Sequence, residues 1–305
     1  MGIKANGSSI SNTLPEFVKG DKGQGDRYKE FMSAITRYLP KRRLSRWVGQ
    51  LVHWEGPSFW TRPAIRIFAW LYNIDLDEAE KPYYEYPSIG EFFVRRLKAG
   101  LRPVASSWAV HPADSRITQS SAMDDGTLIQ AKGITYNLEE FTQDPDCQKK
   151  WSGGYFLTYY LCPTDYHRVH SPVEGKITRV RYIPGELWPV NEWSTTNVRD
   201  LFTVNERVVV EIETDLGPVG VVFVGATNVG HIVLSFDESV RGNAVNPQMI
   251  DKTYNPPIAV KKGDELGMFR MGSTVVMLYP PHFRQKFERH LDLGPAVRVN
   301  AALIK

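Results

Sequence analysis

The stretch RVVVEIETDLGPVGVVFV, which occupies residues 207–224, has two runs of β-branched residues separated by a segment with Asp, Gly and Pro. Runs of this length and composition, bounded by turn-forming residues, are typical of β-strands. Tyr155–Leu161 and Thr274–Tyr279 have the same character. The chain after about Ala105 therefore predicts a β-rich domain, a sandwich or a barrel.

The segment from Arg27 to Tyr72 has a different texture. Its apolar residues recur at helical spacing, as Trp47 and Leu51 do. A spacing of three or four residues places side chains on one face of an α-helix, so the segment predicts short amphipathic helices. Pro57 and Pro63 are each expected at a helix boundary or in a first turn.

The same segment is strongly basic. It has nine Lys or Arg and two Glu, a local charge of +7, whereas the whole chain of 305 residues carries +3. It also contains four of the eight tryptophans, which are Trp47, Trp54, Trp60 and Trp70. Indoles and cations on short helices suit the interface of an anionic bilayer. An ordinary helical subdomain with a solvated basic face gives the same pattern, and the small net charge gives no argument for nucleic acid.

The sequence lacks the features of a membrane-spanning protein, a secreted disulfide-rich protein and the common cofactor-binding proteins. No run approaches the roughly 18 apolar residues that a spanning helix requires. Residues 1–26 lack the apolar core of a secretory signal and predict a flexible lead-in. Cys147 and Cys162 are expected to be free thiols. The chain has no phosphate-binding loop, no dinucleotide fingerprint and no zinc-type spacing of Cys and His, so any cofactor is expected to be unusual.

The residues that stand out for chemistry are two histidines, an aspartate and a serine. His167 and His170 belong to the polar segment Thr164–Pro172, which follows a predicted strand. In a loop, both imidazoles can converge on one site. Asp114 and Ser273 complete the residue types of nucleophilic catalysis, in which a carboxylate orients an imidazole that takes the serine proton. Residue types alone do not establish such a triad.

Seven segments stand in a fixed order along the chain: Ser88–Arg95, Ile129–Gly133, Asp165–His170, Tyr182–Leu187, Asn205–Val208, Val224–Thr227 and Gly267–Thr274. Together they resemble the bacterial and mitochondrial (type I) phosphatidylserine decarboxylases. The resemblance runs from about Leu39 to the C-terminus.

The resemblance implies a self-processing enzyme with a pyruvoyl cofactor made from Ser273. The Ser273 hydroxyl attacks the carbonyl of Gly272, and the ester that forms is broken by elimination. This single cleavage leaves chains 1–272 and 273–305. Hydrolysis with loss of ammonia then leaves a pyruvoyl group at the start of the shorter chain. Its ketone forms a Schiff base with the substrate amine and accepts the electrons released as carbon dioxide leaves, so no metal is expected.

The resemblance also places the other site residues. Asp114 and His170 are expected to be the self-cleavage partners of Ser273, with His170 as general base and Asp114 holding its tautomer. His167 is expected to protonate the carbon that has lost carbon dioxide. The family usually has Gly where this chain has Ser115, and if that position needs φ > 0, Ser115 adds strain of about 1 kcal/mol or more.

Two other functions remain open. A Ser-His-Asp hydrolase would use Asp114, His170 and Ser273 in that chain order, although Ser273 lacks the Gly-x-Ser-x-Gly elbow. A non-catalytic lipid-binding relative is suggested by Ser115. Preference for acyl or ether lipid tails is not readable from the sequence.

The expected architecture is α+β. Residues 1–26 form the lead-in, 27–104 a helical membrane-associating subdomain, and 105–305 a β-rich barrel or sandwich that carries catalysis. The expected partners are phosphatidylserine in a membrane, an anionic lipid surface and a second copy, in a homodimer of cleaved heterodimers. The expected location is peripheral, on the cytoplasmic face of the inner (plasma) membrane in a bacterium.

Overall fold

The computed structural model describes part of the chain in detail. The described residues are 49–131, 134–190, 192–226, 231–242, 247–270, 273–287 and 293–303. All of them belong to one compact unit, Lys41–Lys305. The predicted lead-in and the basic helices before residue 49 lie outside these ranges, as do Trp47 and Gly272. The predicted boundary between 104 and 105 stays a prediction.

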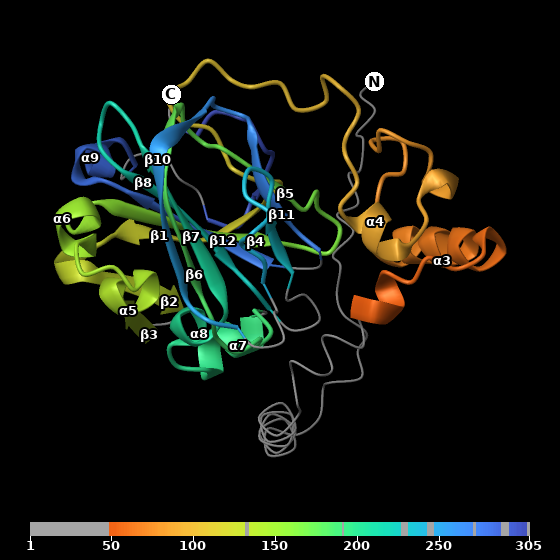
Figure 1. Ribbon diagram of the computed structural model, residues 1–305, viewed down its shortest axis with the longest axis horizontal. Coiled ribbons are helices and arrows are strands. Elements are labelled where there is room, and N and C mark those ends of the chain that lie inside the picture. Colours follow the sequence, from red (N-terminus) through yellow and green to blue (C-terminus); the bar gives the residue numbers. More distant parts are fainter. Residues whose placement is uncertain are drawn as a thin grey trace, which may run out of the picture. The chain divides into compact units, whose positions relative to one another are not determined.

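An eight-stranded antiparallel sheet forms the centre of the unit (Figure 1). Its strand order is β10-β6-β7-β8-β12-β4-β1-β13. The strands are β1 (Ser115–Ala122), β4 (Tyr155–Leu161), β6 (Gly175–Ile183), β7 (Arg207–Glu213), β8 (Val219–Val224), β10 (Ile250–Val260), β12 (Ser273–Tyr279) and β13 (Ala296–Val297). The strands predicted at 155–161, 207–213 and 219–224 are confirmed at both ends, and β12 begins one residue before the predicted run.

Two smaller antiparallel sheets accompany it. One has the order β5-β11-β9, and the other pairs β2 with β3. Their strands are β2 (Thr127–Ala131), β3 (Ile134–Asn137), β5 (Arg168–His170), β9 (Ile232–Leu234) and β11 (Glu265–Phe269). Phe223 of β8 contacts Phe269 of β11 with ring centroids 5.3 Å apart, so the large sheet and the β5-β11-β9 sheet share one core.

The sheet arrangement fits the sandwich alternative of the sequence analysis. Within the described ranges the large sheet is open, with β10 and β13 at its edges, and it does not close into a barrel. The valine-rich strands explain the layering, because β7 and β8 are buried along nearly their whole length. A strand buried on both faces needs cover on each side, which a second sheet and short helices provide.

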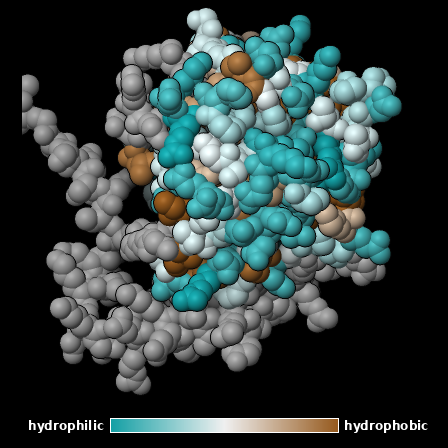
Figure 2. All heavy atoms as spheres, turned by 90° about the vertical axis from the view of Figure 1, so that its left-hand side faces the viewer, coloured by the Kyte–Doolittle hydropathy of each residue, from teal (hydrophilic) through white to brown (hydrophobic). Residues whose placement is uncertain are grey.

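Short helices complete the β-rich part. They are α5 (Leu138–Thr142), α6 (Cys147–Trp151), α7 (Glu192–Asn197), α8 (Leu201–Val204) and α9 (Arg284–Phe287), with 3-10 turns η2 (Asp124–Gly126) and η3 (Pro281–Phe283). The face over α5 and α6 is mostly hydrophilic, with isolated apolar side chains (Figure 2). Both cysteines are free thiols.

The helical segment before residue 100 has its own small core. It consists of α3 (Ser58–Leu71), η1 (Tyr83–Glu85) and α4 (Ile89–Phe93). Pro57 is the N-cap of α3, as expected, whereas Pro63 lies inside the helix and not at a boundary. The helix buries Thr61, Ile65 and Ala69 at four-residue spacing against this core. In the described ranges, no helix is long and apolar enough to cross a membrane.

Candidate active site

Two connections between the sheets meet at one place. The chain passes from β4 to β5 between Leu161 and Arg168, and from β11 to β12 between Phe269 and Ser273. The backbone of Ser273 pairs with Leu161, and the N–H of Phe269 donates to the carbonyl of His167 at 3.1 Å. Both ends of the second connection are thus fixed against the first. Gly272 and the side chain of Ser273 lie outside what the structure describes, whereas Phe269 and the backbone of Ser273, on either side of the predicted cleavage site, pair with His167 and Leu161.

His167 is fully buried at this junction. Its Nδ1 donates to the carbonyl of Asp165 at 2.8 Å, and its ring lies against Phe93 with centroids 4.0 Å apart. Because Nδ1 carries the proton, Nε2 is an acceptor, and it has no hydrogen-bond partner among the described residues. Burial, assisted by the positive charge of Arg95, lowers the pKa of His167 to about 3. The imidazole is therefore neutral at pH 7 with a free lone pair.

His170 lies at the other end of β5 and is held at both ring nitrogens. Nδ1 donates to the carbonyl of Gly263 at 2.7 Å, and the Tyr166 hydroxyl, 3.1 Å from Nε2, donates to it. Burial lowers the pKa of His170 below its usual value, and the hydrogen bond to the Gly263 carbonyl and the charge of Glu265 partly oppose this effect.

Asp114 is buried but does not contact His170. Its carboxylate accepts hydrogen bonds from Arg102 at 2.7 Å, from Arg298 at 3.0 Å and from the backbone N–H of Val299 at 2.8 Å. The expectation that Asp114 holds the tautomer of His170 therefore differs from the geometry, in which the Gly263 carbonyl has that role. Asp114 is still close enough for its charge to raise the pKa of both histidines.

Ser115 carries no left-handed strain. It is the first residue of β1, paired with Val297, and it is not among the residues with positive φ. Its hydroxyl donates to the carbonyl of Ala113 at 3.1 Å. Ser115 in place of the family's usual Gly thus introduces no backbone strain next to Asp114, which is the residue before β1.

The structure adds residues that the sequence reasoning missed. One is Tyr166, whose hydroxyl donates to Nε2 of His170. Its position within the Asp165–His170 segment could have identified it as a candidate. Arg95 is buried, and its Nε and Nη1 have no partner among the described residues. Burial lowers the pKa of Arg95, and its charge acts on His167. Nη2 of Arg95 donates to the carbonyl of Thr164 at 3.5 Å, so its other two nitrogens and Nε2 of His167 offer donors and an acceptor for a bound molecule.

The described residues are compatible with the pyruvoyl group that the family resemblance implies. The backbone of residue 273 pairs with Leu161, at the start of the connection that carries His167, and the buried Nε2 of His167 has no partner among the described residues and can serve as an acid–base group. Among the same residues, no group of three or more His, Cys, Asp or Glu side chains is arranged to hold a metal ion.

Comparison with known proteins extends over most of the chain. The family model described as phosphatidylserine decarboxylase matches residues 89–305. A protein of Anaeromyxobacter sp. (strain K) named phosphatidylserine decarboxylase proenzyme is 43% identical over 279 residues, which is 90% of this chain and 97% of the relative. Proteins with the same name are 43% identical in Myxococcus xanthus, over 81% of this chain and 88% of the relative, and 40% identical in Vibrio cholerae, over 87% and 95%.

Proposed function

This chain belongs to the phosphatidylserine decarboxylase family, and from that premise we propose that it cuts itself between Gly272 and Ser273 and decarboxylates phosphatidylserine. It is a carboxy-lyase that yields phosphatidylethanolamine and carbon dioxide. The observation that carries the site assignment is the buried, unpartnered Nε2 of His167, a residue of the β4–β5 connection whose backbone carbonyl accepts from Phe269 on the connection that leads to β12. A hydrolase is disfavoured, because Asp114 bonds to arginines and not to His170.

Self-cleavage begins when the Ser273 hydroxyl loses its proton and attacks the Gly272 carbonyl, so the amide becomes an ester and the amine of residue 273 is freed. Loss of the Cα proton of residue 273 then expels the Gly272 carboxylate and leaves a carbon–carbon double bond. Water replaces the nitrogen, ammonia departs, and a ketone remains at the head of chain 273–305. The word proenzyme in the relatives' names supports such processing.

We assign the proton transfer of self-cleavage to His170 acting through Tyr166. The Tyr166 hydroxyl donates to Nε2 of His170, so its oxygen can accept the Ser273 proton while its own proton passes to the imidazole. General bases are most effective when their pKa lies near the working pH. His167, whose pKa is lowered to about 3, is therefore too weak a base for this step, whereas His170 is linked to the Tyr166 hydroxyl.

His167 suits the opposite task. We assign to its unpartnered Nε2 the delivery of a solvent-derived proton to the carbon that has lost carbon dioxide. The low pKa makes the protonated ring a strong acid, which favours delivery of the proton to that carbon. Once formed, the pyruvoyl ketone supplies a sink for the electrons released in decarboxylation. The buried position excludes bulk water, which would compete for the proton.

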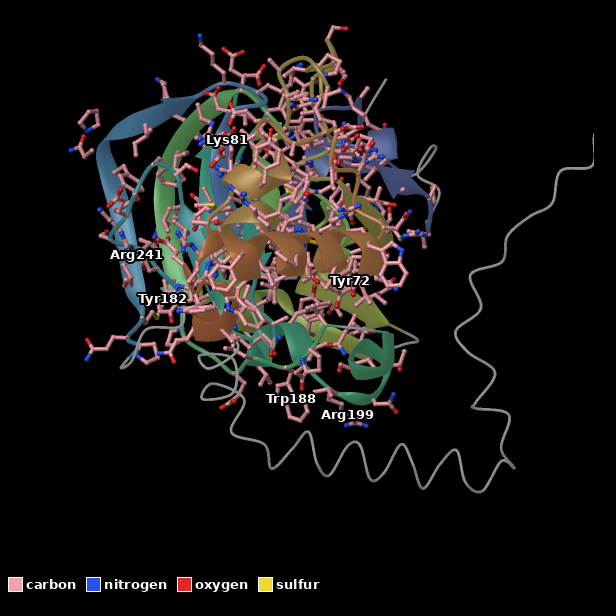
Figure 3. All side chains as sticks on the ribbon, turned by 90° about the vertical axis from the view of Figure 1, so that its right-hand side faces the viewer. Tyr72, Lys81, Tyr182, Trp188, Arg199 and Arg241 are labelled. Carbon is pink, nitrogen blue, oxygen red and sulfur yellow. The ribbon has the colours of Figure 1, made fainter. Side chains whose placement is uncertain are left out.

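The exposed side of α3 is the proposed contact with an anionic lipid surface. Trp60 and Trp70 are 64% and 78% exposed, and Arg62 and Arg66 of the same helix are exposed as well. The helix α3 lies on the face of the protein that Figure 3 shows. Aromatic rings at headgroup level with neighbouring cations are typical of interfacial helices. Exposed apolar patches usually mark a surface that binds a partner, and here the membrane that contains the lipid substrate would be that partner.

Two further proposals rest on the family resemblance alone. One is a homodimer of cleaved heterodimers, which light scattering of the purified protein tests. The other is a peripheral location on the cytoplasmic face of the inner membrane in a bacterial cell, which protease accessibility in right-side-out vesicles tests.

The deciding experiment is the intact mass of the denatured protein. We expect two fragments, 1–272 and 273–305, with the shorter one lacking a free N-terminal amine and reacting with hydrazine, and carbon dioxide release from phosphatidylserine. Ser273→Ala is the matched control and should remain one chain. A folded wild-type protein that stays whole and releases no carbon dioxide contradicts the proposal.

A further inference from the structure

A basic groove of about 650 Å³ lies on the β5-β11-β9 sheet. Its floor is one cross-strand row, in which Met268 of β11 pairs with Arg168 of β5 on one side and with Val233 of β9 on the other. These three side chains are partly exposed, whereas their strand neighbours Val169, Ile232 and Phe269 are buried in the core. The alternation of a strand explains why one face of the sheet is free to line a groove.

The groove carries an excess of positive charge. Four arginines and two glutamates line it. Arg168 and Glu265 form a close pair at 2.7 Å, so these two charges neutralise each other. Arg96 and Arg241 have carboxylates only at 3.6 and 3.4 Å, and both side chains are 60% exposed. Guanidinium groups with long contacts and open access are suited to take an anion from solution.

The positive charge of the groove also affects two neighbouring histidines. Burial lowers the pKa of His231, and the positive charges of Arg270 and Arg241 lower it further. Burial and Arg270 likewise lower the pKa of His53. The arginine charges that lower these two pKa values also favour the binding of an anion.

The groove adjoins the reacting position. Arg270 lines it and precedes Ser273 by three residues, so their Cα atoms are at most roughly 11 Å apart. In a phosphoserine-type headgroup, only a few bonds separate the amine from the phosphorus. An amine held at position 273 therefore brings the phosphodiester within reach of the arginines along this groove.

We propose that the groove bounded by Arg96, Arg241 and Arg270 binds the phosphodiester of the lipid headgroup. This inference rests on the proposed function and adds to it the site that selects a phospholipid over other serine derivatives. The phosphodiester is unchanged in the reaction, so its contacts hold substrate and transition state equally. Such contacts act on KM and leave kcat unchanged.

The test uses Arg96→Gln, Arg241→Gln and the double variant with soluble dihexanoyl phosphatidylserine, which removes any effect of charge on vesicle binding. Each single variant should be cut normally and raise KM about fivefold to tenfold at unchanged kcat, because a charge-assisted hydrogen bond contributes about 1 kcal/mol or more. The double variant should raise it by about the product. Arg241→Lys should lie between wild type and Arg241→Gln.

Arg199→Gln is the matched control. Arg199 is also an exposed arginine, at a distance from Arg241 (Figure 3), and KM should stay at the wild-type value. Dihexanoyl phosphatidylglycerol, which has the phosphodiester without the amine, should compete with wild type and lose most of that competition in the double variant.

Three results overturn the proposal: an unchanged KM in the double variant, a fall in kcat at constant KM, or inhibition by inorganic phosphate as strong as that by dihexanoyl phosphatidylglycerol. The last result would assign the groove to free anions. Failure of the proposed function is distinct, because wild type itself would then stay uncut and release no carbon dioxide.

Discussion

The buried carboxylate of Asp114 accepts a hydrogen bond from the backbone N–H of Val299 at 2.8 Å, and this contact joins the two chains that self-cleavage would produce. Arg298 adds a second contact at 3.0 Å, and Arg102 holds the carboxylate from the long-chain side. Asp114 thus binds the C-terminal segment through hydrogen bonds to Arg298 and Val299. We expect Asp114 to contribute to the active site by holding this segment in place as well as through its charge.

Replacement of Asp114 by Asn should destabilise the fold strongly. The change leaves Arg102 and Arg298 without their shared carboxylate, and breaking a buried pair costs about 3–5 kcal/mol. Urea unfolding of Asp114→Asn in the uncut Ser273→Ala background measures it. Glu78→Gln is the control, because Glu78 bonds the same Arg102 at a more exposed site and should cost about 1 kcal/mol or less. A cost for Asp114→Asn as small as that of the control would refute the role of Asp114 in holding this segment in place.

The two histidines should separate self-cleavage from decarboxylation. His167→Ala should still be cut but release carbon dioxide at least about 100-fold more slowly, because it lacks the group that delivers the proton. His170→Ala should remain mostly uncut. Gel analysis and carbon dioxide release measure the two steps. An uncut His167→Ala protein would transfer the role of base to His167.

Tyr166→Phe is the companion variant for His170. It removes the hydroxyl that donates to Nε2 while keeping the ring against the imidazole. We expect slower self-cleavage and a normal fold, measured by the time course of fragment appearance and by circular dichroism. Cleavage at the wild-type rate would show that the relay through Tyr166 is not used.

The α3 surface should govern binding to vesicles. Trp60→Gln with Trp70→Gln should weaken binding to phosphatidylglycerol-containing vesicles by at least about tenfold, since two indoles no longer enter the interface. Sedimentation measures binding, and self-cleavage should be unaffected. Met249→Gln is the control, because Met249 is 47% exposed and lies outside α3, in the residue before β10. Equal binding by the double variant and wild type would reject this surface.

The short chain should stay bound after cleavage. β12 lies between β4 and β8, and Val275–Tyr279 are fully buried there. Cutting the chain before Ser273 removes one covalent bond but none of these strand pairings. Native gel filtration should therefore elute both fragments together, and separation should require denaturant. Two separate native peaks would contradict the placement of β12.

Stability should fall as pH falls below 6.5, partly through His111. Burial lowers the pKa of His111 to about 4, so between pH 6.5 and 4 the unfolded chain binds a proton that the folded chain does not. His111 alone then costs at most about 2 kcal/mol between pH 6.5 and 5. Urea unfolding of Ser273→Ala and of Ser273→Ala with His111→Gln measures it. The His111→Gln protein should lose less stability, and equal losses would exclude His111.

The strands were readable from the sequence because their signal is local. The β-branched runs at 207–213 and 219–224 lie within single strands, and the composition of each run fixes its structure. Pro63 was misjudged because tertiary packing of Ile65 and Ala69 keeps α3 continuous through it. The choice between sandwich and barrel depends on which strands pair, and no local pattern encodes this.

The strand-forming runs and the basic, tryptophan-rich segment could be recognised in the amino-acid sequence, and the family resemblance pointed to Ser273, His167 and His170. The contacts of each side chain became known from the folded structure. His170 bonds to Gly263, 93 residues away, and Asp114 bonds to Val299, 185 residues away. Such contacts follow from strand register and from the paths of chain connections, which are set by the packing of the whole core and not by neighbouring residues.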